Sequence, residues 1–324
     1  MIEIKEFLEI NKIPFKKNIE LKKITRKNSK VILSLYSTPK TTESFEQLIE
    51  YCLTKKIKFE VVGQMWNTYF RDSFKCDILI STIKLNKFIK KDNLLICETG
   101  CSLPVIANWA KKNLIKDFEG FSGIPATVGG AAINNAGSSN SEMSKVVKTV
   151  TVITEDNKKL TFSNSDLDYK TRQSKIKIGD IKAYVIQVSL DISSKDSKEN
   201  IELNYKKYQE YRVKNIDGRN KSLGSVFVST TLRPIYKRYK LNFICKAIVF
   251  RFLKIFISDI TNRKDLNTRL IFLFLGYPRM AQHCDSFNRF VWKKNTSEND
   301  YFQYIYLMKK LSRNKAVLEN QIKE

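Results

Sequence analysis

A cluster of glycines in the first half of the chain has the composition of an anion-binding loop. Glycine is scarce, at 11 of 324 residues, yet five glycines fall within the eighteen positions from Gly120 to Gly137. Such a concentration indicates a backbone that adopts positive φ angles or approaches another group closely. A loop of this kind turns several N–H groups toward one point, which suits a pyrophosphate. The alternative is a tight turn packed against a helix.

The order of residues in this cluster is specific enough to suggest a family. The nine residues from Gly123 to Ala131 read GIPATVGGA, and Asn135-Ala136-Gly137 and Glu142 follow. This pattern resembles the flavin-binding motif of the MurB family of UDP-N-acetylenolpyruvoylglucosamine reductases, roughly GIPGTVGGA and then NAG. The resemblance implies that the loop binds FAD through Gly123, Ile124, Pro125, Ala126, Thr127, Val128, Gly129, Gly130, Ala131, Asn135 and Gly137.

Further motifs follow in the family's order. Arg172 and Ser174 resemble its Tyr-Arg-x-Ser motif, with Thr171 in place of the tyrosine, and Gly224-Ser225-Val226-Phe227 resembles its Gly-Ser-x-Phe motif. The stretch from His283 to Phe290, with a helical tail ending at Leu318-Glu319, resembles the family's C-terminal part. The resemblance implies an α+β fold of the PCMH-type flavoprotein kind, with a two-part FAD domain and a C-terminal substrate domain.

The resemblance also implies a reaction. In the family, NADPH reduces FAD, and the reduced flavin delivers hydride to the enolpyruvyl group of a UDP-sugar to form a peptidoglycan precursor. Hydride addition leaves a carbanion beside a carboxylate, which needs a proton donor and a group that stabilises negative charge. By resemblance, Ser225 is the proton donor and Arg172 stabilises the charge. Outside that context, Ser225 would be a turn residue and Arg172 a surface ion pair.

Several positions depart from the family pattern. The C-terminal catalytic glutamate is replaced by Gln321, whose amide can form hydrogen bonds but cannot exchange a proton. In the first flavin loop, Gly-Gly-Gly-Ser-Asn becomes Gly63-Gln64-Met65-Trp66-Asn67, so only Gly63 and Asn67 remain as cofactor-binding candidates. Residues 138–140 read Ser-Ser-Asn where many members have Ala-Tyr-Gly. The alternative is therefore a divergent paralogue with altered or lost activity, for example in surface-polysaccharide synthesis.

The composition limits which partners and metals the protein is expected to bind. The net charge is +25, but lysines are spread over the whole chain and no nucleic-acid-binding motif is present, so we expect no specific nucleic-acid partner. One histidine and six scattered cysteines exclude the common zinc patterns, and we expect no metal. The first residues do not resemble a signal peptide, which predicts a cytoplasmic protein. We expect a monomer that takes a UDP-sugar and NADPH.

The elements expected around these motifs alternate between strands and helices. Runs such as Val31–Leu35, Phe59–Gly63 and Val146–Ile153 predict strands, and the spacing of Phe45, Leu48 and Cys52 predicts a helix. We expect an FAD subdomain over 1–72, a second over 73–200 and a substrate domain over 201–324.

The substrate domain carries a basic and aromatic insertion near 232–265. Residues 233–256 hold seven Lys or Arg and no acid, and residues 241–258 predict a helix with Lys246, Arg251 and Lys254 within about 140° of one another. This helix could be buried, could contact a protein partner, or could lie on an anionic membrane as a peripheral contact. Because these three charged residues interrupt the apolar run, we do not expect this helix to span a membrane.

Overall fold

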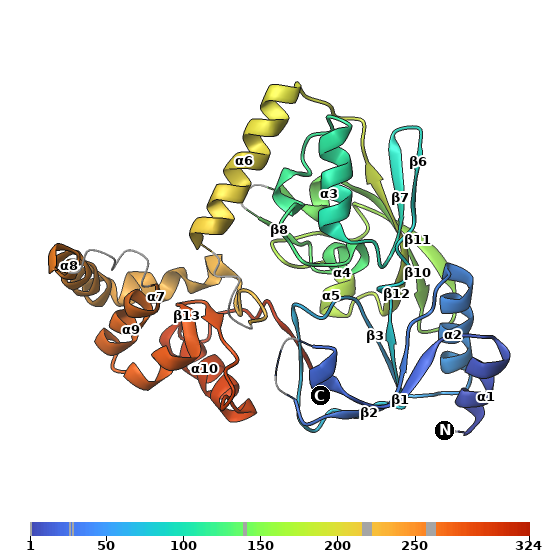
Figure 1. Cartoon of the computed structure of the whole chain (residues 1–324), viewed down its shortest axis with the longest axis horizontal. Coiled ribbons are helices and arrows are strands. Elements are labelled where there is room, and N and C mark those ends of the chain that lie inside the picture. Colours follow the sequence, from blue (N-terminus) through green and yellow to red (C-terminus); the bar gives the residue numbers. More distant parts are fainter. Residues whose placement is uncertain (1, 26, 28, 139–140, 216–221, 257–263) are drawn as a thin grey trace. The chain divides into compact units, whose positions relative to one another are not determined.

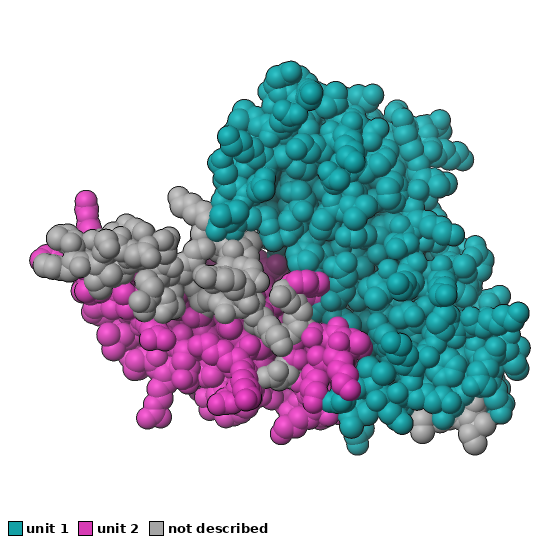
Figure 2. Space-filling view, viewed as in Figure 1, with its two compact units in different colours: residues 1–20, 32–65, 75–216 teal, residues 21–31, 66–74, 217–324 magenta. Residues whose placement is uncertain are grey.

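The computed structural model describes the chain apart from residues 1, 26, 28, 139–140, 216–221 and 257–263 (Figure 1). The chain divides into two compact units (Figure 2). Unit 1 comprises residues 1–20, 32–65 and 75–216; unit 2 comprises residues 21–31, 66–74 and 217–324. This division differs from the expected boundaries at 72 and 200, since residues 201–216 belong to unit 1 and two short early segments belong to unit 2. The three-domain organisation stays a prediction.

The first part of unit 1 is a four-stranded sheet in the order β1-β2-β5-β3. β1 runs antiparallel to β2, and β5 runs parallel to both of its neighbours. Thr41 begins the second helix with a capping box, and Phe45 and Leu48 on that helix are fully buried against the sheet core. The elements are α1 (Ile2–Ile10), β1 (Phe15–Glu20), β2 (Ile32–Ser37), α2 (Thr42–Thr54), β3 (Phe59–Val62) and β5 (Ile78–Ser81).

The second part of unit 1 is a five-stranded antiparallel sheet in the order β11-β10-β12-β7-β6. Its strands are β6 (Phe88–Lys91), β7 (Leu94–Glu98), β10 (Val147–Thr154), β11 (Lys159–Ser163) and β12 (Ala183–Asp191). The helices are α3 (Leu103–Lys112), α4 (Val128–Ile133), α5 (Lys175–Ile178) and α6 (Lys198–Asn215), with short 3₁₀ turns η2 (Glu119–Phe121) and η3 (Met143–Lys145). A small hairpin, β8 (Gly137–Ser138) with β9 (Ser141–Glu142), follows α4. α4 contacts β7 and β12 of this sheet.

Unit 2 is mainly helical and has its own core. Aromatic residues dominate that core, with Tyr69, Phe290, Tyr301 and Tyr304 buried together. The chain's last strand, β15 (Gln321–Lys323), runs parallel to β4 (Thr68–Phe70), so the C-terminus is paired with a segment some 250 residues earlier. The other elements are η1 (Leu21–Lys23), η4 (Ser229–Leu232), α7 (Arg233–Arg238), α8 (Lys240–Phe256), α9 (Lys264–Phe274), η6 (Pro278–His283), β13 (Cys284–Ser286), β14 (Arg289–Phe290) and α10 (Glu298–Leu311).

The expected strands and helices of unit 1 are present within a few residues, and the α+β class is confirmed. The predicted C-terminal helix is wrong in its length, because α10 ends at Leu311 and not at Leu318. Arg313 and Asn314 take left-handed φ angles of 53° and 61°, which end the helix, and Leu318 then pairs with Phe227 as an isolated bridge. The predicted insertion helix is α8, although residues 257–263 of the insertion and the side chain of Lys254 lie outside the described part.

Candidate active site

The glycine-rich loop of unit 1 leads directly into α4. Thr127 is the N-cap of this helix, and its hydroxyl accepts a hydrogen bond from the Gly130 N–H. The Gly129 N–H donates to the Thr99 carbonyl over 2.8 Å, and a Cβ at Gly129 would lie only 1.9 Å from Thr99 Oγ1. Glycine is therefore required at position 129 by packing of α4 against the end of β7. At this position the structure supports the packing explanation that the sequence left open.

The Asn-Ala-Gly turn after α4 is equally constrained. A Cβ at Gly137 would lie 1.8 Å from the Ser141 carbonyl oxygen, so no side chain fits there. Asn135 takes a left-handed φ of 42°, and its side chain donates to Glu142 and to the Lys170 carbonyl while accepting from the Ser144 N–H. This one buried amide therefore joins three separate segments of unit 1 around the hairpin.

Arg172 reaches the same turn from the loop before α5. Its guanidinium donates to the carbonyls of Asn135 and Gly137 over 3.2 and 2.5 Å, and it lies 3.9 Å from the Glu142 carboxylate. Arg172 itself takes a left-handed φ of 59°. The nearby Ser174 caps α5 and donates to the Ile133 carbonyl over 2.6 Å. The structure thus brings Arg172 into direct contact with Asn135 and Gly137, which were predicted from a separate motif about 35 residues earlier.

The first flavin loop begins in unit 1 next to the glycine-rich loop. A Cβ at Gly63 would lie 2.3 Å from Thr127 Oγ1, so the Gly63 main chain meets the Thr127 side chain directly. Met65 takes a left-handed φ of 56°, a conformation that glycine adopts more easily, and its side chain is buried. The Met65 side chain is therefore packed within the protein.

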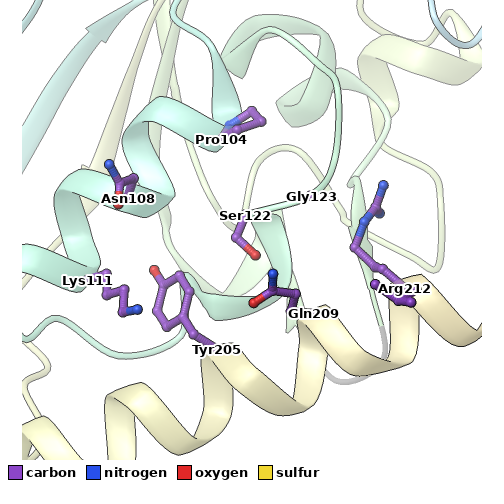
Figure 3. Close-up of a pocket in the computed structure, with 9 residues that line it drawn as sticks. Pro104, Asn108, Lys111, Ser122, Gly123, Tyr205, Gln209 and Arg212 are labelled. Carbon is purple, nitrogen blue, oxygen red and sulfur yellow. The ribbon is translucent and has the colours of Figure 1, made fainter. Parts of the chain in front are cut away.

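A cavity of about 460 Å³ adjoins the glycine-rich loop at Ser122 and Gly123, as Figure 3 shows. Arg212 on α6 packs against Gly123, where a Cβ would lie 2.0 Å from its Nε. On the α3 side, Lys111 Nζ lies 5.2 Å from the centre of the Tyr205 ring, whose hydroxyl donates to the Ala107 carbonyl. The cavity is therefore bordered by two cationic side chains, neither of which the sequence motifs indicated.

In unit 2, Ser225 lies beside the C-terminal segment. The Val226 carbonyl accepts from the Glu319 N–H over 2.8 Å, and the Gln321 N–H donates to the Asn67 carbonyl over 2.9 Å. Ser225 is half-buried and follows Gly224, whose φ is 75°. Three predicted residues, Ser225, Asn67 and Gln321, are thus gathered in one place although they come from three distant parts of the sequence.

Asn320 holds this cluster together. Its side-chain Nδ2 donates to Asn67 Oδ1 over 2.6 Å and to the carbonyls of Leu223 and Ser225, each over 3.1 Å. Its Oδ1 accepts from the Tyr301 hydroxyl over 2.9 Å. Asn320 is buried, and sequence reasoning missed it. The available signal was its place between Glu319 and Gln321, inside the stretch already identified from the family motif.

A buried lysine lies beside β4 in the same unit. Lys27 is 2% exposed, with Nζ 3.6 Å from the Tyr69 ring centre and 3.3 Å from the Phe70 carbonyl oxygen that it donates to. Burial lowers the pKa of Lys27 to about 6, although Glu298 and Asp72 oppose the shift. Glu298 in turn accepts from the Tyr69 hydroxyl and the Asp72 N–H over 3.1 and 2.7 Å. This arrangement supports β4, the strand that begins directly after Asn67.

His283, the chain's one histidine, is a packing residue in unit 2. Its ring stacks on Phe290 at 5.5 Å, and Nε2 lies 3.7 Å from Asp300. Burial lowers its pKa despite the opposing effect of Asp300. Of the predicted catalytic residues, Arg172 belongs to unit 1, whereas Ser225 and Gln321 belong to unit 2.

The main chain at Gly63 and Gly123 lies against the side chains of Thr127 and Arg212, with no room for a Cβ, and α4 begins directly after the glycine-rich loop with Thr127 as its N-cap. A four-stranded sheet is followed by a five-stranded antiparallel sheet, and the glycine-rich loop lies between β7 and β10 of the second sheet, which defines the class as an α+β protein. Residues 33–163 match the family model described as "FAD binding domain".

Comparison with known proteins shows which reductases the chain resembles. The chain is 33% identical over 175 residues to UDP-N-acetylenolpyruvoylglucosamine reductase of Clostridium novyi (strain NT), covering 53% of this chain and 57% of the relative. It is 30% identical over 201 residues to the enzyme of that name from Clostridium kluyveri (strain NBRC 12016), covering 62% and 64%. The aligned region thus spans about three fifths of these relatives. The MurB structure from Thermus caldophilus shares the fold, with a TM-score of 0.64, 18% identity and coverage of 96% and 99%. The chain is thus similar in sequence to MurB reductases over about three fifths of their length and shares the fold of a MurB structure.

Proposed function

We propose that the protein is an FAD-dependent oxidoreductase that uses NADPH to reduce the enolpyruvyl group of UDP-N-acetylglucosamine enolpyruvate, a step of peptidoglycan precursor synthesis. The observation that carries the proposal is the Asn320 side chain, which bonds both Asn67 and the Ser225 carbonyl. One amide thereby holds the proposed proton donor and a proposed cofactor-binding residue in a fixed relation within unit 2.

Bound FAD would supply the hydride-transfer chemistry, held by the loop from Gly123 to Ala131 together with Gly63, Asn67, Asn135 and Gly137. The chain's own residues then handle the substrate's charge and proton. Hydride addition places a negative charge on the substrate carbon beside a carboxylate. Ser225 then donates the proton that this carbon needs. The Arg172 guanidinium suits that carboxylate, because its planar donors match two oxygens at once.

Gln321 replaces the acid of the family motif, and its neutral amide can orient the substrate without exchanging a proton. Its main chain is fixed by the bond to Asn67 and by the pairing of β15 with β4. We therefore propose turnover that is slower than an acid at this position would give. The alternative is a divergent paralogue without this activity, and the following experiment distinguishes it from an active reductase.

The test divides the reaction into two halves. Purified protein is reduced anaerobically with NADPH, and its reoxidation by UDP-N-acetylglucosamine enolpyruvate is followed by stopped-flow absorbance. Ser225→Ala should reduce at the wild-type rate but reoxidise about 10²–10⁴-fold more slowly, since general acids contribute factors of that size. Ser229→Ala, at an exposed position in the same segment, is the matched control. Equal reoxidation by wild type and Ser225→Ala would remove Ser225 from the mechanism, and no reoxidation by wild type would favour the paralogue.

A further inference from the structure

Helix α8 presents a narrow apolar stripe to solvent. Leu241, Ile244 and Ile248 are 75%, 42% and 58% exposed, and Phe252 is 63% exposed. Cys245, between them, is also exposed. At about 100° per residue these positions fall within roughly 100° of the helix circumference. An exposed stripe of this length on one helix is a feature of surfaces that bind something apolar.

The opposite face of α8 fixes the helix within unit 2. Asn242 Nδ2 donates to the Phe274 carbonyl at the end of α9 over 2.5 Å. The Phe243 ring lies 4.8 Å from Tyr236 and 5.7 Å from Phe287. Asn242 and Phe243 point about 110° and 150° away from the middle of the stripe, counted along the helix. The apolar stripe is therefore held outward by specific contacts, and the alternative that α8 is buried in the domain does not hold for the residues of the stripe.

Positive charge lies along one edge of the stripe. Residues 233–256 contain no acid, and Arg233, Lys237, Arg238, Lys240 and Arg251 are exposed. Lys240 and Arg251 lie within about 40° of the same edge of the stripe on the helical wheel. An apolar stripe with a basic border matches the interface of an anionic bilayer, where apolar side chains enter the acyl boundary and cations meet headgroups. A second copy of this chain would bring the same positive border against itself, which opposes pairing through this face.

We propose that α8 docks the protein on an anionic lipid surface, lying in the plane of the membrane interface. Within the described residues, no helix is long and apolar enough to cross a membrane. The apolar stripe supplies insertion, and the basic border supplies selectivity for acidic headgroups. The proposed enzyme would thus work close to a membrane. This inference is independent of the redox activity, since neither the stripe nor its border includes a residue of the candidate active site.

The test measures binding of the full chain to sedimented vesicles. Wild type should bind vesicles of phosphatidylglycerol and phosphatidylcholine at least tenfold better than vesicles of phosphatidylcholine alone. Leu241→Ser with Ile248→Ser should weaken binding to the acidic vesicles at least tenfold. The matched control is Leu203→Ser with Ile178→Ser, which removes the same residue types at 50% and 54% exposure from unit 1 and should bind like wild type. Circular dichroism and sedimentation equilibrium accompany each variant.

A fluorophore on Cys245 reports the surroundings of the stripe and leaves its four apolar side chains unchanged. In a Cys76→Ser background the other cysteines are buried, so an environment-sensitive fluorophore should react at Cys245. Its emission should shift to the blue with acidic vesicles and stay unchanged with phosphatidylcholine vesicles. Equal vesicle binding by the stripe variant and its control, with no emission shift, would overturn the proposal and leave only diffuse attraction by the +25 charge. A dimer that the stripe variant abolishes, without vesicle binding, would identify a second copy as the occupant.

Discussion

The glycine-rich loop of unit 1 and the Ser225 cluster of unit 2 are held in place by different means. In unit 1, main-chain contact excludes side chains, as at Gly129 beside Thr99 and at Gly137 beside the Ser141 carbonyl. In unit 2, the side chain of Asn320 gathers the segments through hydrogen bonds. Steric exclusion permits almost no substitution, whereas a hydrogen-bonded amide leaves neighbouring positions free to change.

This difference fits the distribution of departures from the family motif. The loop from Gly123 to Ala131 keeps all but one position, while the C-terminal motif has lost its acid at Gln321. We infer that the glycine-rich loop of unit 1 keeps the motif because its geometry is also its packing. The site residues of unit 2 are not needed for packing in the same way, so their chemistry can change without loss of the fold.

Gly137→Ala should have the largest effect. The added Cβ would lie 1.8 Å from the Ser141 carbonyl oxygen, so the hairpin must move. Overpacking of this kind should cost about 3 kcal/mol of unfolding free energy and release bound FAD. Thermal denaturation and flavin content measure the two effects. Gly130→Ala is the control, since its nearest such contact is Thr127 Oγ1 at 3.2 Å and alanine favours a helix; it should lose no more than about 1 kcal/mol. Similar losses in both variants would show that steric exclusion is not what distinguishes Gly137.

Asn320→Ala should be the next most severe change. It leaves the carbonyls of Leu223 and Ser225 and the Tyr301 hydroxyl without this partner in a buried region. Loss of such partners typically costs about 1–3 kcal/mol, which urea denaturation can resolve. The exposed Asn295→Ala serves as the control and should change stability little. If Asn320→Ala were as stable as that control, the amide would not be what holds the Ser225 cluster.

Lys27→Met should stabilise the protein at neutral pH. The pKa of Lys27 is about 6 in the folded state and 10.5 ordinarily, so between these values the unfolded chain binds more protons. Wild-type stability should therefore rise from pH 6 to pH 10.5. The methionine variant should be about 1–2 kcal/mol more stable at pH 7, after the lost bond to Phe70 is deducted, and its advantage should vanish near pH 10. Lys30→Met, at an exposed site, should show no such trend; a pH-independent gain at Lys27 would point to apolar packing alone.

The sequence predicted the unit 1 loop well because its glycines are rare elsewhere in the chain and their order is distinctive. The sequence could not predict that Thr99 leaves no room for a side chain at Gly129, because that contact joins α4 to the end of β7 across the fold. Asn320 was missed for a similar reason, because a single amide in a polar tail has no periodicity and its partners lie as far away as Asn67. The end of α10 depends on left-handed turns at Arg313 and Asn314, which those residue types do not demand.

Gln321→Glu should have the smallest effect and acts only on chemistry. A carboxyl at this position restores the family's acid, and we expect reoxidation by the UDP-sugar to rise by no more than about tenfold. The gain stays limited because Thr171 and residues 138–140 still differ from the family, and misplacement of substrate by about 1 Å can cost on the order of 10²-fold. Stopped-flow reoxidation measures it, with FAD content as the control. A wild type as fast as the variant would show that Gln321 does not limit the reaction.

The central claim, that unit 1 retains a working flavin site, is tested most directly by the visible absorption spectrum of the purified full chain. We predict flavin bands corresponding to one FAD per chain, directly after purification or after incubation with FAD. The bands should be lost in Gly137→Ala and persist in the exposed Asn295→Ala. A colourless protein that FAD cannot reconstitute would contradict the account.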